Sequence, residues 1–179
     1  MTAQQNLPFE RFYNLANLSE AGDEILFTSS REDLARLAHL AGVDAVDNFE
    51  ATVTLRRLSP NRFAYEATLT AAIVQSCVVT LDPVKSHVER RFQRVLQVSP
   101  GAARLPEPGN EIVLTLAGDE APEEIQSTRY DLAAPLLEEF VLAIDPYPRA
   151  GGVTFEPPAA QGPAPESPFT VLKRLKIQD

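Results

Sequence analysis

The chain has 179 residues, one cysteine and a formal net charge of −9, which suits one domain that buries a core without disulfides. Cys77 has no partner for an internal disulfide, and this favours a cytoplasmic protein. An acidic chain binds nucleic acid poorly, so RNA contact would need a local basic patch or a protein partner. We find no signal peptide and no apolar run of the roughly 18 residues typical of a membrane helix, and we expect neither a membrane nor DNA as a partner.

The first part of the chain predicts a short strand followed by a helix. Residues 9–18 favour an extended edge segment, and residues 25–28 favour a short strand. Ser29 and Ser30 each precede an acidic residue by three positions, which is the spacing of a capping box. Gly42 stands where a left-handed glycine would end the helix.

The centre of the chain, from Phe49 to Leu96, predicts a β-sheet. Two runs of alternating apolar and polar residues are joined by Ser59-Pro60-Asn61, which is typical of a hairpin. We expect residues 77–81 to continue the sheet before Asp82-Pro83 interrupts it. In the next segment, residues 84–96, apolar residues recur every four positions, which fits either a helix or a strand. We favour a strand, because its valines and Phe92 favour extended structure.

The sequence then predicts a loop, a strand, a second loop and a helix. Residues 99–110 are rich in proline and glycine, residues 112–116 favour a strand, and residues 119–124 form an acidic loop. The helix either opens at Tyr130-Asp131-Leu132, with Asp131 as its cap, or starts at Ala134 with Pro135 at its first position.

The helix carries a wide apolar surface that includes Phe140, so we expect it to cover the sheet. The predicted fold is α+β, an antiparallel β-meander sheet covered by two main helices, in residues 1–145. Residues 146–166 are rich in Pro, Gly and Ala and predict a flexible linker. Residues 167–179 predict a short basic amphipathic helix at the end of a mobile tail.

Two basic clusters are candidate partner-binding sites. The apolar and basic positions of the tail are the residues expected to contact a partner: Phe169, Leu172, Lys173, Arg174 and Lys176. The second cluster is Arg90, Arg91 and Arg94, with Lys85 and His87 nearby; it predicts either partner contact or a solvated strand edge that resists aggregation.

The sequence contains no recognisable catalytic motif. We therefore expect no catalytic residues, no cofactor and no metal site. Glu138 and Glu139 are adjacent on a helix and so diverge, which favours a solvated face over a pair of catalytic acids. Cys77 is expected to be a small core residue, with a redox or metal role as the alternative.

Three stretches, in order, resemble the YceD family of large ribosomal RNA subunit accumulation proteins, a domain of unknown function. Cys77 to Val84 is similar to the family's C-x-R-C-L-x-P-v element. Tyr130 to Pro148 resembles its I-D-L…E-E-hydrophobic-L-A-L-P-x-x-P block, and Ser167 to Lys176 resembles N-P-F-A-V-L-K-K-L-K. The likeness covers Cys77 to the end, whereas the first third of the chain matches only in general pattern.

The chain departs from the family pattern at Thr80, where many relatives have a second cysteine, and at Val79, where they have arginine. If relatives bind zinc through those cysteines, this chain is not expected to, because one thiolate cannot make a tetrahedral site. The resemblance implies a non-enzymatic role in ribosome biogenesis, with large-subunit ribosomal RNA or a basic large-subunit ribosomal protein as partner. Two other functions stay open from the residues alone: a small-molecule-binding domain, and a protein-interaction module unrelated to ribosomes.

Overall fold

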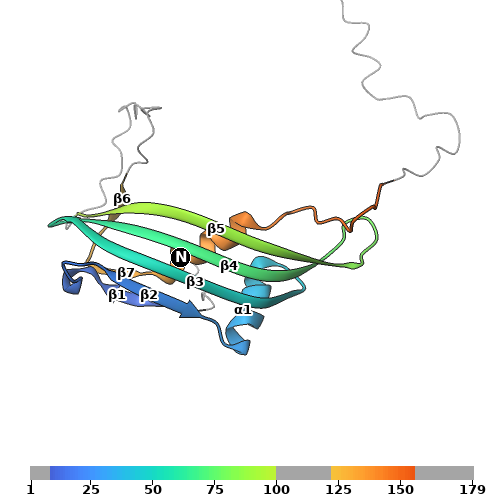
Figure 1. The fold of residues 1–179 in the computed structure, drawn as a ribbon, viewed down its shortest axis with the longest axis horizontal. Coiled ribbons are helices and arrows are strands. Elements are labelled where there is room, and N and C mark those ends of the chain that lie inside the picture. The colour runs from blue at the N-terminus through green and yellow to red at the C-terminus, as the bar shows by residue number, and fades with distance from the viewer. Residues whose placement is uncertain (1–8, 100–121, 156–179) are drawn as a thin grey trace, which may run out of the picture.

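The computed structural model describes residues 9–99 and 122–155. These residues form an α+β fold with a five-stranded, mostly antiparallel sheet and two helices (Figure 1). In spatial order the strands are β2 (Asp23–Thr28), β3 (Ala45–Ser59), β4 (Arg62–Ser76), β5 (Pro83–Val98) and β6 (Glu123–Ile125). The predicted α+β class is therefore confirmed.

The sheet is mixed, because β6 runs parallel to β5 while β2 to β5 are antiparallel. The predicted meander is confirmed only over β2 to β5. The expectation of an acidic loop over residues 119–124 is wrong at its end, since Glu123 and Glu124 belong to β6. These two residues pair with Leu96 and Gln97 of β5, and this pairing outweighs the low strand propensity of glutamate.

A second, two-stranded sheet joins β1 (Phe12–Asn14) to β7 (Arg129–Asp131). A 3-10 turn, Leu15–Asn17, follows β1, so only part of the predicted extended segment is a strand. The prediction that Tyr130 opens a helix is wrong, because Tyr130 pairs with Tyr13 in this ladder. The pairing continues past the strands, where the N–H of Leu132 donates to the carbonyl oxygen of Arg11 at 2.9 Å.

The first helix, α1 (Arg31–Ala41), begins and ends as the sequence predicts. Ser30 and Asp33 form the capping box: the Asp33 N–H donates to Ser30 Oγ at 3.2 Å, and the Ser30 N–H donates to Asp33 Oδ2 at 3.0 Å. Gly42 ends the helix with φ of 66°, a left-handed conformation that glycine adopts without strain.

The second helix, α2 (Ala133–Ala143), begins between the two predicted starts. Its first N–H, that of Ala133, donates to Asp131 Oδ1 at 3.0 Å, so Asp131 supports the helix end from within β7. Pro135 stands at the third helical position and not at the first. Its missing N–H costs no helical hydrogen bond there, because the first turn has no acceptors for its donors.

Both helices contribute to one core on the inner face of the sheet. The face consists of alternate residues of β3 and β4, including Phe49, Tyr65 and Leu69, all fully buried. Phe140 of α2 meets Phe49 edge-on, with 5.4 Å between ring centroids. The Tyr65 hydroxyl donates to the carbonyl oxygen of Leu132 at 2.8 Å. The prediction that α2 covers the sheet is confirmed.

The prediction that residues 77–81 continue the sheet is wrong, because β4 ends at Ser76 and a turn follows. The prediction of a strand over residues 84–96 is confirmed by β5. The expected strand at residues 112–116 and the expected helix at 167–179 lie outside the described residues. Of the described helices, none has the length and apolar character needed to span a bilayer.

Candidate functional site

The basic cluster predicted around β5 is divided between the two faces of the sheet. Tyr65 lies opposite Arg94, and Leu69 lies opposite Arg90, so both arginines belong to the inner face. Arg91 lies opposite Thr68, on the outer face. Because successive residues of a strand point to opposite sides, neighbouring positions in sequence cannot form one surface patch here.

Arg90 and Arg94 tie the sheet to α2. Arg94 contacts Glu138 Oε2 at 2.6 Å, Glu139 Oε1 at 3.5 Å and Glu123 Oε2 at 3.5 Å, while Arg90 contacts Glu139 Oε2 at 3.4 Å. Burial lowers the pKa of Arg94, but the hydrogen bond to Glu138 and the nearby carboxylates outweigh it and hold that pKa above its ordinary value. A partner-binding role for Arg90 and Arg94 stays a prediction, and it would compete with these ion pairs.

Arg91 shares the outer face with Lys85 and His87. Their opposite residues on β4 are Thr68 for Arg91, Val74 for Lys85 and Ala72 for His87. All three basic side chains are exposed, and Glu89 lies between His87 and Arg91 on the same face. This row lies on the outer face of the sheet, so it can contact a partner without breaking an inner-face ion pair.

The turn after β4 is built around Cys77. The N–H of Cys77 donates to the carbonyl oxygen of Asp82 at 2.8 Å, and the N–H of Leu81 donates to the carbonyl oxygen of Cys77 at 2.9 Å. Leu81 closes the turn with φ of 65°, a left-handed conformation that is uncommon outside glycine. The turn places Cys77 at 0 % exposure while its neighbours Val78 and Leu81 stay exposed.

The Cys77 sulfur accepts hydrogen bonds from several sides. The N–H groups of Val79 and Ala150 lie 3.5 Å and 3.4 Å from Sγ. The hydrogen bond from the Thr80 hydroxyl, with those from the N–H groups of Ala150, Thr80 and Val79, outweighs burial and lowers the pKa of the thiol from 9.0 to about 6. The prediction of a buried cysteine is confirmed, but the residue sits in a turn, where its sulfur accepts hydrogen bonds that favour the thiolate form.

Residues 145–150 close over this turn, although they are distant in sequence. The N–H of Val78 donates to the carbonyl oxygen of Pro148 at 2.9 Å. The amide of Gln75 donates through Nε2 to the carbonyl oxygen of Asp145 at 3.0 Å. We call the two segments together, Cys77–Asp82 and Asp145–Ala150, the turn junction. In Figure 1 the β4–β5 loop and the segment after α2 meet at one end of the sheet.

The turn junction is the feature that the sequence patterns did not predict. Asp82-Pro83 and Asp145-Pro146 indicated breaks in regular structure, but nothing in their spacing indicated that the two breaks meet. The residues predicted to bind a partner in the tail lie outside the described part of the chain: Phe169, Leu172, Lys173, Arg174 and Lys176. The described chain ends at Phe155, five residues beyond the junction.

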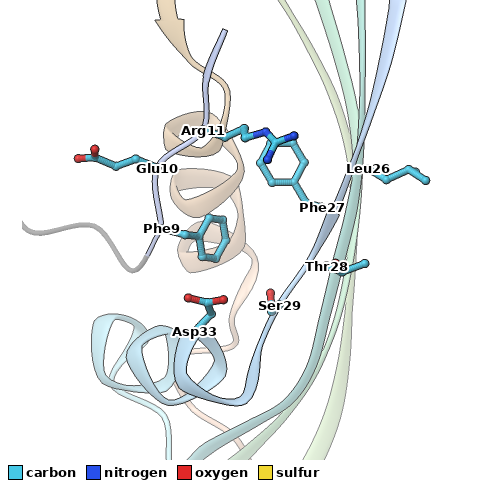
Figure 2. Close-up of a pocket in the computed structure, with 8 residues that line it drawn as sticks. All are labelled: Phe9, Glu10, Arg11, Leu26, Phe27, Thr28, Ser29 and Asp33. Atoms are coloured by element: carbon cyan, nitrogen blue, oxygen red, sulfur yellow. The ribbon is translucent and has the colours of Figure 1, made fainter.

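A small pocket lies away from the junction, between the N-terminal segment, β2 and the start of α1 (Figure 2). Its volume is about 180 Å³, and its lining includes Phe9, Arg11, Phe27 and Asp33. The pKa of Asp33 is lowered by its hydrogen bonds with Ser30, so this carboxylate is already engaged in the helix cap. Ligand sites are commonly 300 Å³ or larger as an approximate rule, and the pocket does not favour a small-molecule function.

Across residues 9–99 and 122–155, no group of three or more His, Cys, Asp or Glu side chains is arranged to hold a metal ion. No protein-family model, no curated protein and no solved structure matches this chain.

Proposed function

We propose that this chain is a non-enzymatic, cytoplasmic ribosome biogenesis factor that supports the synthesis, processing or accumulation of large-subunit ribosomal RNA. Within the proposal, the folded body is a platform and the C-terminal residues 167–179, as a short helix on a flexible linker, bind the partner. The partner is large-subunit ribosomal RNA or a basic ribosomal protein of that subunit.

One observation carries the proposal. The first stretch that resembles the YceD family, Cys77 to Val84, and the end of the second, Asp145 to Pro148, are about sixty residues apart in sequence. They meet at the turn junction, where the N–H of Val78 donates to the carbonyl oxygen of Pro148 at 2.9 Å. Two stretches selected only for their residues thus form one structural unit, which supports treating them as one inherited feature.

Charge supports the partner class. The chain is at −9 and residues 167–179 are at +2, so the remainder is at −11. An acidic body suits a basic ribosomal protein, whereas the basic residues Lys173, Arg174 and Lys176 suit RNA. Arg91 on the exposed outer face is the body residue best placed to join such a contact.

The test is deletion of the gene followed by a sucrose gradient of the ribosomes. We expect fewer large subunits and accumulated precursor of the large-subunit RNA, both restored by the full chain. The level of small-subunit ribosomal RNA, measured in the same strain, is the control. Normal large-subunit levels together with normal precursor RNA would refute the proposal.

A further inference from the structure

The turn junction exposes large apolar side chains to solvent. Three of its residues are exposed: Val78 at 47 %, Leu81 at 76 % and Tyr147 at 71 %. Backbone hydrogen bonds bring their segments together. The N–H of Val78 donates to the carbonyl oxygen of Pro148, which follows Tyr147, and the N–H of Leu81 donates to the carbonyl oxygen of Cys77, which precedes Val78. We call these three residues the apolar patch. Grouped exposed apolar residues commonly mark a docking surface.

Three aspartates lie next to the turn that carries the patch. Asp44 accepts the Ser76 hydroxyl hydrogen at 2.8 Å, Asp145 accepts the Tyr147 N–H at 2.8 Å, and Asp82 bonds to Cys77 through its carbonyl oxygen. All three carboxylate residues are exposed. Lys85 pairs with Val74 near the end of β4, and Arg149 lies between Pro148 and Ala150 in the turn junction. The local excess of negative charge is therefore small, and apolar contact is the larger contribution.

We propose that residues 167–176 of the same chain dock on the apolar patch. Phe169, Leu172 and Leu175 recur at three-residue spacing and would meet the patch, while Lys173, Arg174 and Lys176 would meet its acidic surroundings. The patch is thus a resting site for the tail. A partner that binds the same side chains of the tail would have to compete with the patch for them.

The short tether between the turn junction and residues 167–176 favours these residues as the occupant of the patch. The described chain ends at Phe155, five residues after the junction, and eleven residues separate it from Ser167. Eleven residues span up to roughly 35–40 Å when extended, so the tail reaches the patch with slack. A short tether gives an effective concentration of about 1 mM, so a segment with an intrinsic Kd of roughly 0.1 mM is docked about ten times more often than free.

The inference does not depend on the ribosomal function, and its test uses the purified full-length chain alone. Trypsin cleaves after Lys173, Arg174 and Lys176, and mass spectrometry follows the loss of the terminal peptide. Trypsin cleaves only the undocked tail, and the docked tail is about ten times more abundant than the free tail in the wild type. Leu81→Asp removes docking, so it should accelerate cleavage roughly tenfold. Aspartate tolerates the left-handed conformation at this position, so the substitution does not strain the turn.

The matched control is Leu58→Asp, the same substitution at a residue that is 56 % exposed. Leu58 lies near the end of β3, beside the start of β4, whereas the patch follows the end of β4. It should leave the cleavage rate unchanged. Tyr147→Ser is the second patch variant if Leu81→Asp lowers the melting temperature, and it should accelerate cleavage as well. Equal rates in wild type and both patch variants would overturn the inference, and so would equal acceleration by Leu58→Asp. Protection that grows with protein concentration would assign the patch to a second copy of the chain and also overturn it.

Discussion

The two faces of the central sheet differ in what they contact. The inner face carries the core and meets α2, and its charged residues Arg90 and Arg94 are paired with carboxylates. The outer face carries threonines and charged residues such as Arg91, which lies in solvent opposite Thr68. The strand β5 contributes to both faces. Whether an arginine faces the core or the solvent is therefore decided by its odd or even position along the strand, and not by how many charged residues are near it in the sequence.

A substitution in the core on the inner face is expected to change the free energy of unfolding most. Phe140→Ala should lower the free energy of unfolding by about 3–5 kcal/mol, because it removes a buried ring that packs edge-on against Phe49 and leaves a cavity. Chemical denaturation measures the change. The control is Val141→Ala, one position along and 40 % exposed, for which the change should be much smaller. Similar losses for both variants would show that α2 is not anchored as described.

A buried hydrogen bond predicts the next effect. Tyr65→Phe removes the hydroxyl that donates to the carbonyl oxygen of Leu132, and the loss of this buried hydrogen bond should cost about 0.5–1.5 kcal/mol of unfolding free energy. Tyr147→Phe, at an exposed position, is the matched control and should change stability little. Burial raises the pKa of Tyr65 above its ordinary value, so its absorbance should not titrate near pH 10 while the protein is folded.

Substitution of the two arginines tests the difference between the two faces. Arg94→Ala should lower the unfolding free energy by about 1 kcal/mol, because Glu138 and Glu123 lose this cation at a half-buried site and Glu139 keeps only Arg90. Arg91→Ala should stay within about 0.5 kcal/mol of wild type. Thermal melting at low and high salt measures both, and high salt should narrow the difference. A loss at Arg91 equal to that at Arg94 would contradict the assignment of faces.

The Cys77 thiol predicts a dependence of stability on pH with a definite sign. Its folded pKa of about 6 lies below the ordinary 9.0, so the folded state releases the proton first. The stabilisation is complete above pH 9 and is lost as the pH falls towards 6. The stability difference between wild type and Cys77→Ala should therefore grow from pH 6 to pH 9. Ultraviolet absorbance of the thiolate gives the midpoint directly, and a midpoint near 9 in the folded protein would contradict the hydrogen bonds to sulfur.

Local signals in the sequence were enough for the elements whose structure is decided locally. Ser30, Asp33 and Gly42 define α1, and the alternation after Phe49 defines the hairpin, because capping and the two-residue period act over a few positions. Long-range pairing decided the rest. Tyr130 entered β7 and Glu123 entered β6 because distant strands supplied their partners. The turn junction could not be predicted, since a backbone bond from Val78 to Pro148 leaves no trace in side-chain pattern.

The most direct test of the proposed function measures the large-subunit peak of a sucrose gradient in a deletion strain that carries either the full chain or one altered form. The altered form is the full chain with Lys173→Ala, Arg174→Ala and Lys176→Ala, checked for equal expression and equal melting temperature. We predict that the unaltered chain restores the large subunits and that the altered chain does not. Full restoration by the altered chain would contradict the claim that the folded body acts through its basic tail.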